Sequence, residues 1–478
     1  MRADCYINGQ WTPAASGRRF PVENPATEEI LAEVASGDAA DIDAAVRAAR
    51  ACFESDLWQS KTSARQRGRM LMTAADLLES RLAEFAELET RQNGKLLFES
   101  RIEIGMSAEV LRYFGGWADK ITGDTLPVSG SFFTYTLKEP VGVVGAITPW
   151  NFPLNLAVWK FAPALAAGCT VVSKPPSEAP LTIILFAEIL EAAGFPAGAF
   201  NVVPGSGSGA GGALVAHPGV DKISFTGSTE VGKGVMKSAA DSVKRVTLEL
   251  GGKSPNIIFA DADIPSAIKG AQNAIFYSKG EVCAAGSRLV VERSVHDQVV
   301  NELAARAKKL TVGDPLDKAT RLGAVVSKKQ QQTVMGYIEK GKAEGGRLVA
   351  GGNTAQVNGK GHYVEATIFD GVTPEMTIAR EEIFGPVLAV QTFDDFDQAV
   401  ALGNQSMYGL AAGIWTKDIQ KAHRTVRAIK AGTVWINTYN FYDPAAPFGG
   451  YKASGFGRDL GAEALAGYLE TKTVWVAL

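Results

Sequence analysis

The segment from Cys169 to Ala260 constrains the fold most strongly, because short β-branched runs alternate there with runs of helical character. The predicted strands are Thr170–Val172, Phe200–Val203, Ile223–Phe225, Val246–Leu250 and Ile257–Phe259, and the predicted helices are Leu181–Ala193 and Val231–Ala240. Strands that alternate with helices of this length are typical of βαβ units around a mostly parallel sheet. The sequence therefore predicts a doubly wound α/β domain.

The segments that precede this region are predicted to be helical. Asp41 can cap a helix whose apolar residues from Ile42 to Phe53 fall on one face, and the segment 70–88 continues the helical character. We therefore expect the first hundred residues to cover the sheet.

Two further segments read as strands outside this body. Residues 122–140 contain turn residues followed by alternating Phe133, Tyr135 and Leu137, as in a β-hairpin, and residues 473–476 form a β-branched run. An isolated hairpin is only marginally stable, so both segments are predicted to make oligomer contacts. The alternative is that both are sheet edges within a domain.

Composition excludes several classes of function. The 478 residues carry 48 basic and 51 acidic side chains, a balance without the positive charge that nucleic acid or an anionic membrane requires. The four cysteines form no C-x-x-C pair and the four histidines have no metal-ligand spacing, so no metal site is predicted. No apolar run reaches the length of a membrane span and no apolar signal core opens the chain, so a cytoplasmic protein with reduced cysteines is expected.

Cys283 is the candidate nucleophile. It stands among small residues in Gly280–Arg288, which would leave its sulfur open to a ligand, and a carboxylate motif at Glu249–Lys253 precedes it. A single cysteine is more often a small buried apolar residue, so the assignment depends on the other motifs.

Asn151 lies in a short turn between Pro149 and Pro153, just before a predicted helix at Leu154–Ala167. A rigid side-chain amide of this kind can donate a hydrogen bond to an oxyanion, together with the backbone N–H of a nucleophile. An Asx turn or a helix cap is the alternative interpretation.

Two glycine-rich segments could bind a phosphate. Gly207–Gly212 matches G-x-G-x-x-G but lacks the acidic residue that follows the next strand in dinucleotide-binding folds, so we give it little weight. Gly227 and Ser228 lie where a strand runs into a helix, and the free amides of that helix could face a pyrophosphate.

Six ordered motifs together resemble the NAD(P)-dependent aldehyde dehydrogenases over essentially the whole chain. They are P-W-N-F-P at 149–153, F-T-G-S-T-E-V-G at 225–232, E-L-G-G-K-S-P at 249–255, G-E-V-C-A-A-G-S-R at 280–288, E-E-I-F-G-P-V at 381–387 and P-F-G-G-Y-K-x-S-G at 447–455. The resemblance implies a dinucleotide-binding domain (1–121 and 141–252), an α/β catalytic domain (253–453) and a β oligomerisation arm (122–140 and 454–478). The active site is expected between the first two domains.

The resemblance also implies the role of each candidate residue. Cys283 would be the nucleophile, Glu249 the base that activates the deacylating water, and Asn151 with the Cys283 amide the oxyanion hole. An aldehyde would thus be oxidised to its acid through a thiohemiacetal and a thioester, with hydride passing to NAD or NADP. The implied cofactor-binding residues are Trp150, Lys174, Ser177, Gly227, Ser228, Glu382 and Phe384.

One departure from the family pattern concerns the cofactor. Relatives that prefer NAD often have a glutamate three residues after the lysine, whereas this chain has Ser177 after Lys174. Without that carboxylate a 2′-phosphate meets less repulsion, so acceptance of NADP is predicted, unless the neighbouring Glu178 replaces the missing carboxylate.

By family position, an aromatic set should line the substrate tunnel: Phe152, Trp159, Tyr277, Tyr442 and Phe448. Such a set suits apolar, aromatic or quaternary-ammonium groups, and core packing is the alternative role. No arginine stands at the matching tunnel positions, which disfavours a carboxylate-bearing semialdehyde, and Arg288 is expected to be structural. A medium-chain or aromatic aldehyde is therefore predicted.

Three other functions remain open. A CoA-acylating semialdehyde dehydrogenase would share the fold and the cysteine, but it tends to lack the carboxylate at position 249. A cysteine hydrolase without nicotinamide would need a histidine partner for Cys283, and none of the four has a recognisable context. A non-catalytic protein on this scaffold would not be expected to retain Asn151, Glu249 and Cys283 together.

Overall fold

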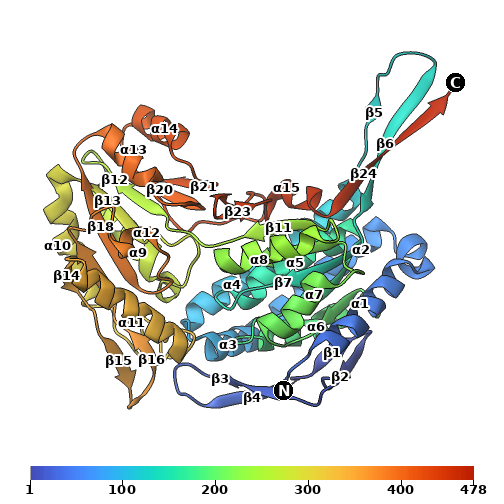
Figure 1. Cartoon of the computed structure of the whole chain (residues 1–478), viewed down its shortest axis with the longest axis horizontal. Helices are drawn as coiled ribbons and strands as arrows, with labels where there is room; N and C mark the ends of the chain where they lie inside the picture. Colours follow the sequence, from blue (N-terminus) through green and yellow to red (C-terminus); the bar gives the residue numbers. More distant parts are fainter. Residues whose placement is uncertain (1) are drawn as a thin grey trace.

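The computed structural model describes residues 2–478, which form two α/β bodies and a projecting β arm (Figure 1). The first body contains an eight-stranded sheet in the order β2-β1-β9-β8-β7-β10-β11-β23. Its strands are β1 (Cys5–Ile7), β2 (Gln10–Thr12), β7 (Val143–Ile147), β8 (Thr170–Lys174), β9 (Phe200–Val202), β10 (Lys222–Thr226), β11 (Arg245–Glu249) and β23 (Gly455–Phe456). The five central strands run parallel, and β1 and β23 are antiparallel to their neighbours in that group.

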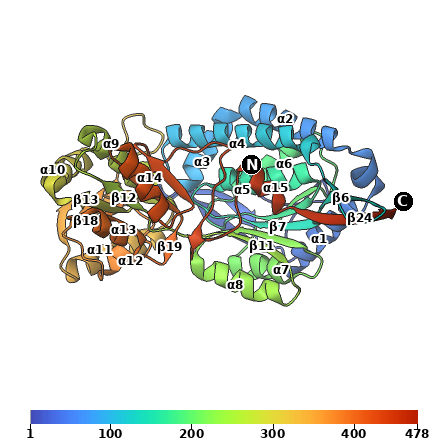
Figure 2. The ribbon, with the colours of Figure 1, turned by 90° about the horizontal axis from the view of Figure 1, so that it is seen from above.

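Helices cover both faces of this sheet. Figure 2 shows one layer above it and another below it. The first layer contains α2 (Ala64–Ser80), α4 (Leu97–Trp117), α5 (Pro153–Ala167) and α6 (Leu181–Ala192), and the second contains α1 (Ala39–Phe53), α7 (Gly212–Ala216) and α8 (Thr229–Ala240).

The position of β7 in the sheet explains why its sequence is apolar throughout. Val144 and Ala146 pack into the core on the α5 side, whereas Val143 and Ile147 pack into the core on the α1 side. Successive side chains of a strand point to opposite faces, so a strand covered on both faces must be apolar at every position. The predicted doubly wound α/β domain is confirmed.

The second body contains a seven-stranded sheet in the order β14-β17-β18-β13-β12-β20-β21. Its strands are β12 (Pro255–Ile258), β13 (Arg288–Glu292), β14 (Arg347–Ala350), β17 (Thr367–Asp370), β18 (Val387–Phe393), β20 (Ala411–Trp415) and β21 (Thr433–Ile436). Only the edge strand β14 is antiparallel to its neighbour. The helices α9 (Ile264–Phe276) and α10 (His296–Ala307) pack on one face, and α13 (Phe396–Asn404) and α14 (Ile419–Ala428) pack on the other.

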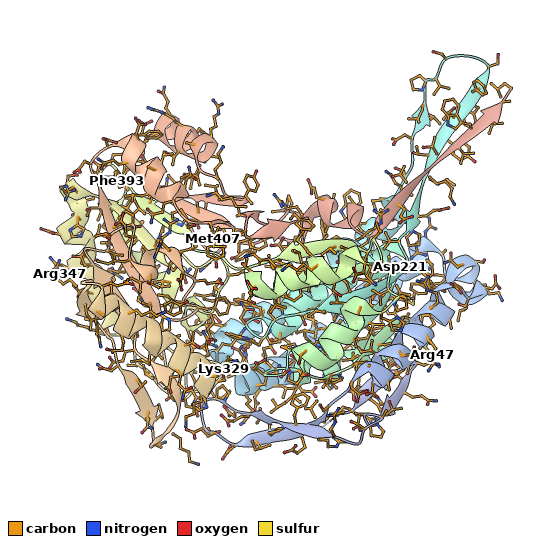
Figure 3. The ribbon with its side chains drawn as sticks, viewed as in Figure 1. Arg47, Asp221, Lys329, Arg347, Phe393 and Met407 are labelled. Carbon is orange, nitrogen blue, oxygen red and sulfur yellow. The ribbon has the colours of Figure 1, made fainter. Side chains whose placement is uncertain are left out.

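The arm is a three-stranded sheet in the order β24-β6-β5. β6 (Phe132–Pro140) pairs with β24 (Leu469–Ala477) along its whole length, and β5 (Thr125–Leu126) completes the predicted hairpin. The two segments that sequence singled out are therefore partners of each other. Figure 3 shows side chains packed throughout the two α/β bodies, while the arm stands away from both.

Three expectations for the N-terminal part are wrong in detail. The first helix is capped by Asp38, whose side chain accepts a hydrogen bond from Ala40, and Asp41 lies inside the helix and accepts from the Asp38 amide at 3.0 Å. The segment 70–88 is divided at Arg81 between α2 and α3 (Leu82–Asn93). Residues 5–35 form strands instead of a helical cover, and β1 and β2 extend the first sheet.

Within residues 2–478 no helix is long and apolar enough to cross a bilayer. Over the same residues no three side chains of His, Cys, Asp or Glu gather where a metal ion could be held.

Candidate active site

The carboxyl ends of four parallel strands bring most of the sequence motifs to one edge of the first sheet. Asn151 follows β7, Lys174 ends β8, Gly227 follows β10 and Glu249 ends β11. After β7 the chain adds β8 on one side and later β10 on the other, so the strand order reverses beside β7. Open α/β sheets bind their ligands at such a reversal, outside the carboxyl ends of the strands.

The second sheet contributes from its amino edge. Cys283 precedes β13, and Glu382 and Phe384 precede β18. Gly252, at the crossing between the two bodies, donates its amide to Glu382 Oε1 at 2.9 Å, and a Cβ there would lie 2.3 Å from the Cys283 carbonyl oxygen. Loops from opposite sheets are thus in direct contact around the nucleophile.

Cys283 lies in a turn between a short helix at Tyr277–Gly280 and β13, and its side chain lines a cavity. Burial raises the pKa of the thiol to about 12, and the nearby carboxylates of Glu382 and Glu249 add to this shift. Both effects disfavour the thiolate. The protonated thiol is therefore favoured over the thiolate in the free protein.

The pH dependence of alkylation tests this resting state. Because the pKa lies far above neutrality, the thiolate is a minor species, and we expect the iodoacetamide reaction of Cys283 to accelerate about tenfold per pH unit between about pH 7 and pH 9. Peptide mapping by mass spectrometry measures the rate at Cys283 alone. A rate that levels off below about pH 8 would show a thiolate already stabilised in the free protein.

Asn151 is held on both its backbone and its side chain. Its carbonyl accepts a hydrogen bond from the buried Lys95 ammonium at 2.6 Å, and its Nδ2 donates to the Glu281 carbonyl at 3.0 Å. An amide nitrogen has two hydrogens, so one N–H remains for a ligand. Since Glu281 is two residues from Cys283, this contact fixes the amide beside the nucleophile.

Glu249 is buried, and neither of its carboxylate oxygens has a hydrogen-bond partner among the described residues. Burial raises its pKa well above the ordinary value, Asp459 raises it further, and Lys160 opposes the shift. A Cβ at Gly449 would lie 2.6 Å from Glu249 Oε1, so a larger residue there would obstruct the carboxylate. A carboxylate that nothing else engages is free to accept a proton from a water or a ligand.

The candidate cofactor residues at the first sheet lie around a helix N-terminus and a buried lysine. Ser228 caps α8, whose first amides are unpaired within the helix and can meet a phosphate. Lys174 is 5% exposed, and burial lowers the pKa of its ammonium to about 8. A Cβ at Gly211 would lie 3.7 Å from the Lys174 side chain. The glycine-rich segment 207–212, which matches G-x-G-x-x-G, therefore also flanks this edge of the sheet. Ser177 donates its hydroxyl to the Gly205 carbonyl at 3.1 Å.

Trp150, Glu382 and Phe384 form the second part of the cofactor set. The rings of Trp150 and Phe384 meet edge to face with centroids 5.1 Å apart. Phe384 has a φ of 57°, a left-handed conformation that is costly for a bulky residue and that tends to occur at functional sites. Burial raises the pKa of Glu382 to about 7.

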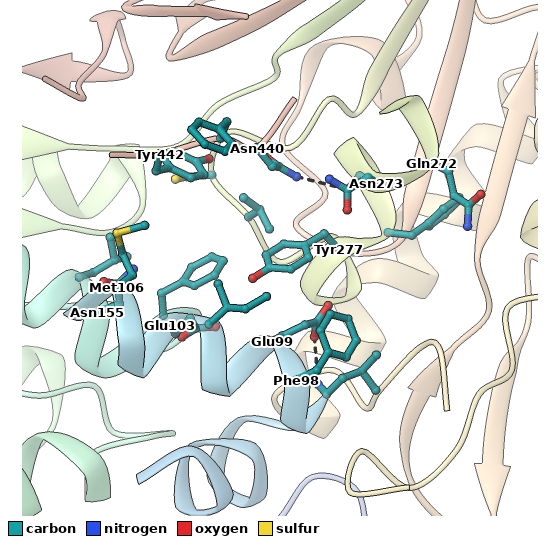
Figure 4. Close-up of a pocket in the computed structure, with 18 of the residues that line it drawn as sticks. Phe98, Glu99, Glu103, Met106, Asn155, Gln272, Asn273, Tyr277, Asn440 and Tyr442 are labelled. Carbon is teal, nitrogen blue, oxygen red and sulfur yellow. Dashed lines mark hydrogen bonds between the residues drawn. The ribbon is translucent and has the colours of Figure 1, made fainter. Parts of the chain in front are cut away.

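Cys283 is among the residues that line a cavity of about 680 Å³, and Figure 4 shows part of this lining. All five residues expected in the substrate tunnel line it. Trp159 lies against Phe448 and Tyr442, with ring centroids 5.6 and 6.2 Å away, and Phe152 stacks on Tyr277 at 6.5 Å. The structure thus brings the aromatic set and the candidate nucleophile to one cavity, while their roles stay predictions.

Arginines line the cavity at positions outside the aromatic set that the resemblance implies. Arg306 and Arg321 both line the cavity, together with Lys269. Arg306 lies in the last turn of α10 and Arg321 lies in a loop. Neither residue belongs to one of the six sequence motifs. Only the packing of these elements brings them to the site. Arg288, in contrast, is structural as expected, since its guanidinium is buried and donates to three backbone carbonyls.

Two buried ion pairs that support the site were also missed. Lys160 pairs with Asp459 at 2.9 Å near Glu249, and Lys95 pairs with Glu103 behind Asn151. In the sequence, only a lysine within the apolar helix α5 indicates the first pair, because Asp459 is 299 residues away from Lys160. Buried charges need partners, so such a lysine predicts a pair without naming the second residue.

The comparisons with known proteins agree with this geometry. A family model described as the aldehyde dehydrogenase family matches residues 11–474. The chain belongs to the aldehyde dehydrogenase family. It is 49% identical to an aldehyde dehydrogenase of Enchytraeus buchholzi over 98% of this chain and 95% of that protein. The predicted family, enzyme class and fold class are thus confirmed.

Solved structures of aldehyde dehydrogenases superimpose closely on this one. The NAD+ complex of the Bacillus cereus enzyme has a TM-score of 0.98 at 48% identity, covering all of this chain and 97% of that one. The P. syringae AldA indole-3-acetaldehyde dehydrogenase, in complex with NAD+ and IAA, has the same TM-score at 46% identity and the same coverage.

Proposed function

We propose that this aldehyde dehydrogenase oxidises apolar aldehydes, aromatic or of medium chain length, to their carboxylic acids with NAD. The cavity carries this proposal, because an aromatic-lined space of about 680 Å³ ends at Cys283. Apolar pockets with a few polar groups are the usual form of small-molecule sites. Complexes of two related enzymes with NAD+ support the choice of cofactor.

The reaction follows from the positions of three side chains. The Cys283 thiol loses its proton to solvent, its sulfur adds to the aldehyde carbonyl carbon, and the free N–H of Asn151 and the Cys283 amide stabilise the oxyanion. NAD, when bound, supplies the acceptor for the hydride that leaves this carbon, so that a thioester remains on Cys283. Glu249 then takes a proton from water, the water oxygen attacks the thioester, and the acid leaves as the sulfur is released.

One assay tests the activity against the two other enzymatic functions. Aldehydes are added with NAD or NADP, with and without CoA, and the absorbance of reduced nicotinamide is followed. We expect turnover without CoA. An absolute requirement for CoA would indicate the acylating enzyme, and hydrolase activity without nicotinamide would indicate a cysteine hydrolase.

We also propose that NADP is accepted, because Ser177 places a neutral hydroxyl where a carboxylate would repel a 2′-phosphate. Ser177→Glu should restore the repulsion and raise the ratio of kcat/KM for NAD over NADP at least tenfold, while kcat with NAD changes little. The control is Ser177→Ala, which removes the bond to Gly205 without adding charge. A wild-type enzyme that prefers NAD by a hundredfold or more would contradict the proposal.

The arm is proposed to join copies of this chain. Its two long strands expose Phe132, Phe133 and Trp475, which are 45%, 47% and 58% exposed. Exposed aromatic residues on a projecting sheet are costly in a monomer and typical of an interface. Light scattering of the purified protein should give a dimer or a tetramer.

A further inference from the structure

The rim of the substrate cavity is positively charged. Lys269, on α9, and Arg321 are exposed, and Arg306, at the end of α10, is partly exposed. Within residues 2–478, neither Lys269 nor Arg321 pairs with a carboxylate, and the Arg321 guanidinium donates only to the carbonyls of Lys318 and Thr320. Arg306 pairs with Glu302 at 2.9 Å.

The acidic groups that line the same cavity are already engaged. Glu99 accepts hydrogen bonds from the Ser278 and Leu96 amides at 2.8 and 2.9 Å, and Glu103 pairs with Lys95. Both side chains are almost fully buried, at 3% and 2% exposed, although both residues belong to the lining of the cavity. They therefore cannot neutralise the exposed cations at the rim.

The lining of the cavity is mostly apolar, with the side-chain amides of Asn155, Gln272, Asn273 and Asn440 among it. Phe98, Ile102 and Phe441 are 54%, 55% and 72% exposed, and they mark the open end. In Figure 4, Tyr442 and Gln272 of α9 lie on opposite sides of the view. A ligand that extends from the sulfur to the opening passes aromatic side chains first and meets the cations last.

We propose that the preferred substrate is an aldehyde with an apolar body and an anionic group, such as a carboxylate, at its far end. The aldehyde lies at Cys283, the apolar body fills the aromatic cavity, and the anion reaches Lys269, Arg306 and Arg321 at the rim. This inference rests on the proposed function. It also separates long substrates from short semialdehydes, whose carboxylate would remain among the aromatic residues, where no unpaired cation is found.

Two aldehydes of equal length test the proposal, a medium-chain alkanal and the same chain with a terminal carboxylate. For wild type we expect kcat/KM to be at least fivefold higher for the carboxylated aldehyde, with a KM that rises with ionic strength for this substrate only. In a Lys269→Gln, Arg321→Gln double variant, kcat/KM should fall about tenfold for the carboxylated aldehyde and stay within twofold for the alkanal. Lys417→Gln, an exposed lysine outside the cavity, is the matched control.

The outcomes distinguish this inference from the function on which it rests. If wild type oxidises both aldehydes equally, or if the double variant slows both by the same factor, the rim does not select an anion and the inference is overturned, while the proposed function stands. If neither aldehyde reduces NAD, the proposed function itself fails.

Discussion

Replacing Cys283 by serine should reduce aldehyde oxidation by at least about a thousandfold. A hydroxyl ionises far less readily than a thiol, and among residues 2–478 no histidine lines the cavity to act as a base for it. The serine side chain is slightly smaller, so the cavity and the cofactor edge should keep their form. Steady-state turnover, with NAD binding followed by fluorescence, measures both properties.

Cys52→Ala is the matched control for this variant. Cys52 lies in α1, away from the cavity, and burial alone raises its pKa to about 11. Full turnover is expected after this change. A Cys283→Ser enzyme that stays within tenfold of wild type, while binding NAD normally, would assign the nucleophile to another group.

Replacing Glu249 by glutamine should separate the two halves of the reaction. The amide cannot take a proton from water, so one equivalent of reduced cofactor should appear rapidly for each active site, followed by steady-state turnover at least about a hundredfold slower than wild type. Stopped-flow absorbance of reduced nicotinamide measures the burst and the slow phase.

The rate of thioester hydrolysis in the wild-type enzyme should change with pH in one direction. Burial raises the pKa of Glu249, so its basic form is gained as pH increases, and hydrolysis should accelerate from neutral to alkaline pH. In Glu249→Gln this dependence should be lost. The control is Glu381→Gln, which changes an exposed carboxylate. This variant should show no burst and should keep the pH dependence of wild type. Normal steady-state turnover in Glu249→Gln would place the base elsewhere.

The sequence predicted those parts of the molecule that local patterns determine. Four of the five central strands were predicted because each contains a short β-branched or apolar run, whereas β7 was not predicted. Cys283, Glu249 and Asn151 became candidates because each stands in its own short motif. The first helix cap was misplaced by three residues, since Asp38 and Asp41 both suit a cap and only the backbone decides between them. The opening strands were missed because residues 5–35 mix polar and apolar residues without a clear period.

The rest depends on contacts between distant segments. The Lys160–Asp459 pair and the positions of the rim arginines depend on how separate elements pack against each other. Local sequence patterns do not predict which elements come into contact. For the same reason, the sequence did not show that β6 and β24 pair with each other, although it predicted a strand in each segment.

The central claim is that the Cys283 sulfur carries the acyl group between oxidation and hydrolysis. It is tested most directly by mixing Glu249→Gln with an aldehyde and NAD, quenching in acid and mapping the peptides by mass spectrometry. The account predicts a mass increase equal to the acyl group on the peptide that contains Cys283, in proportion to the burst. Reduced cofactor without this adduct, or an adduct on another residue, would contradict it.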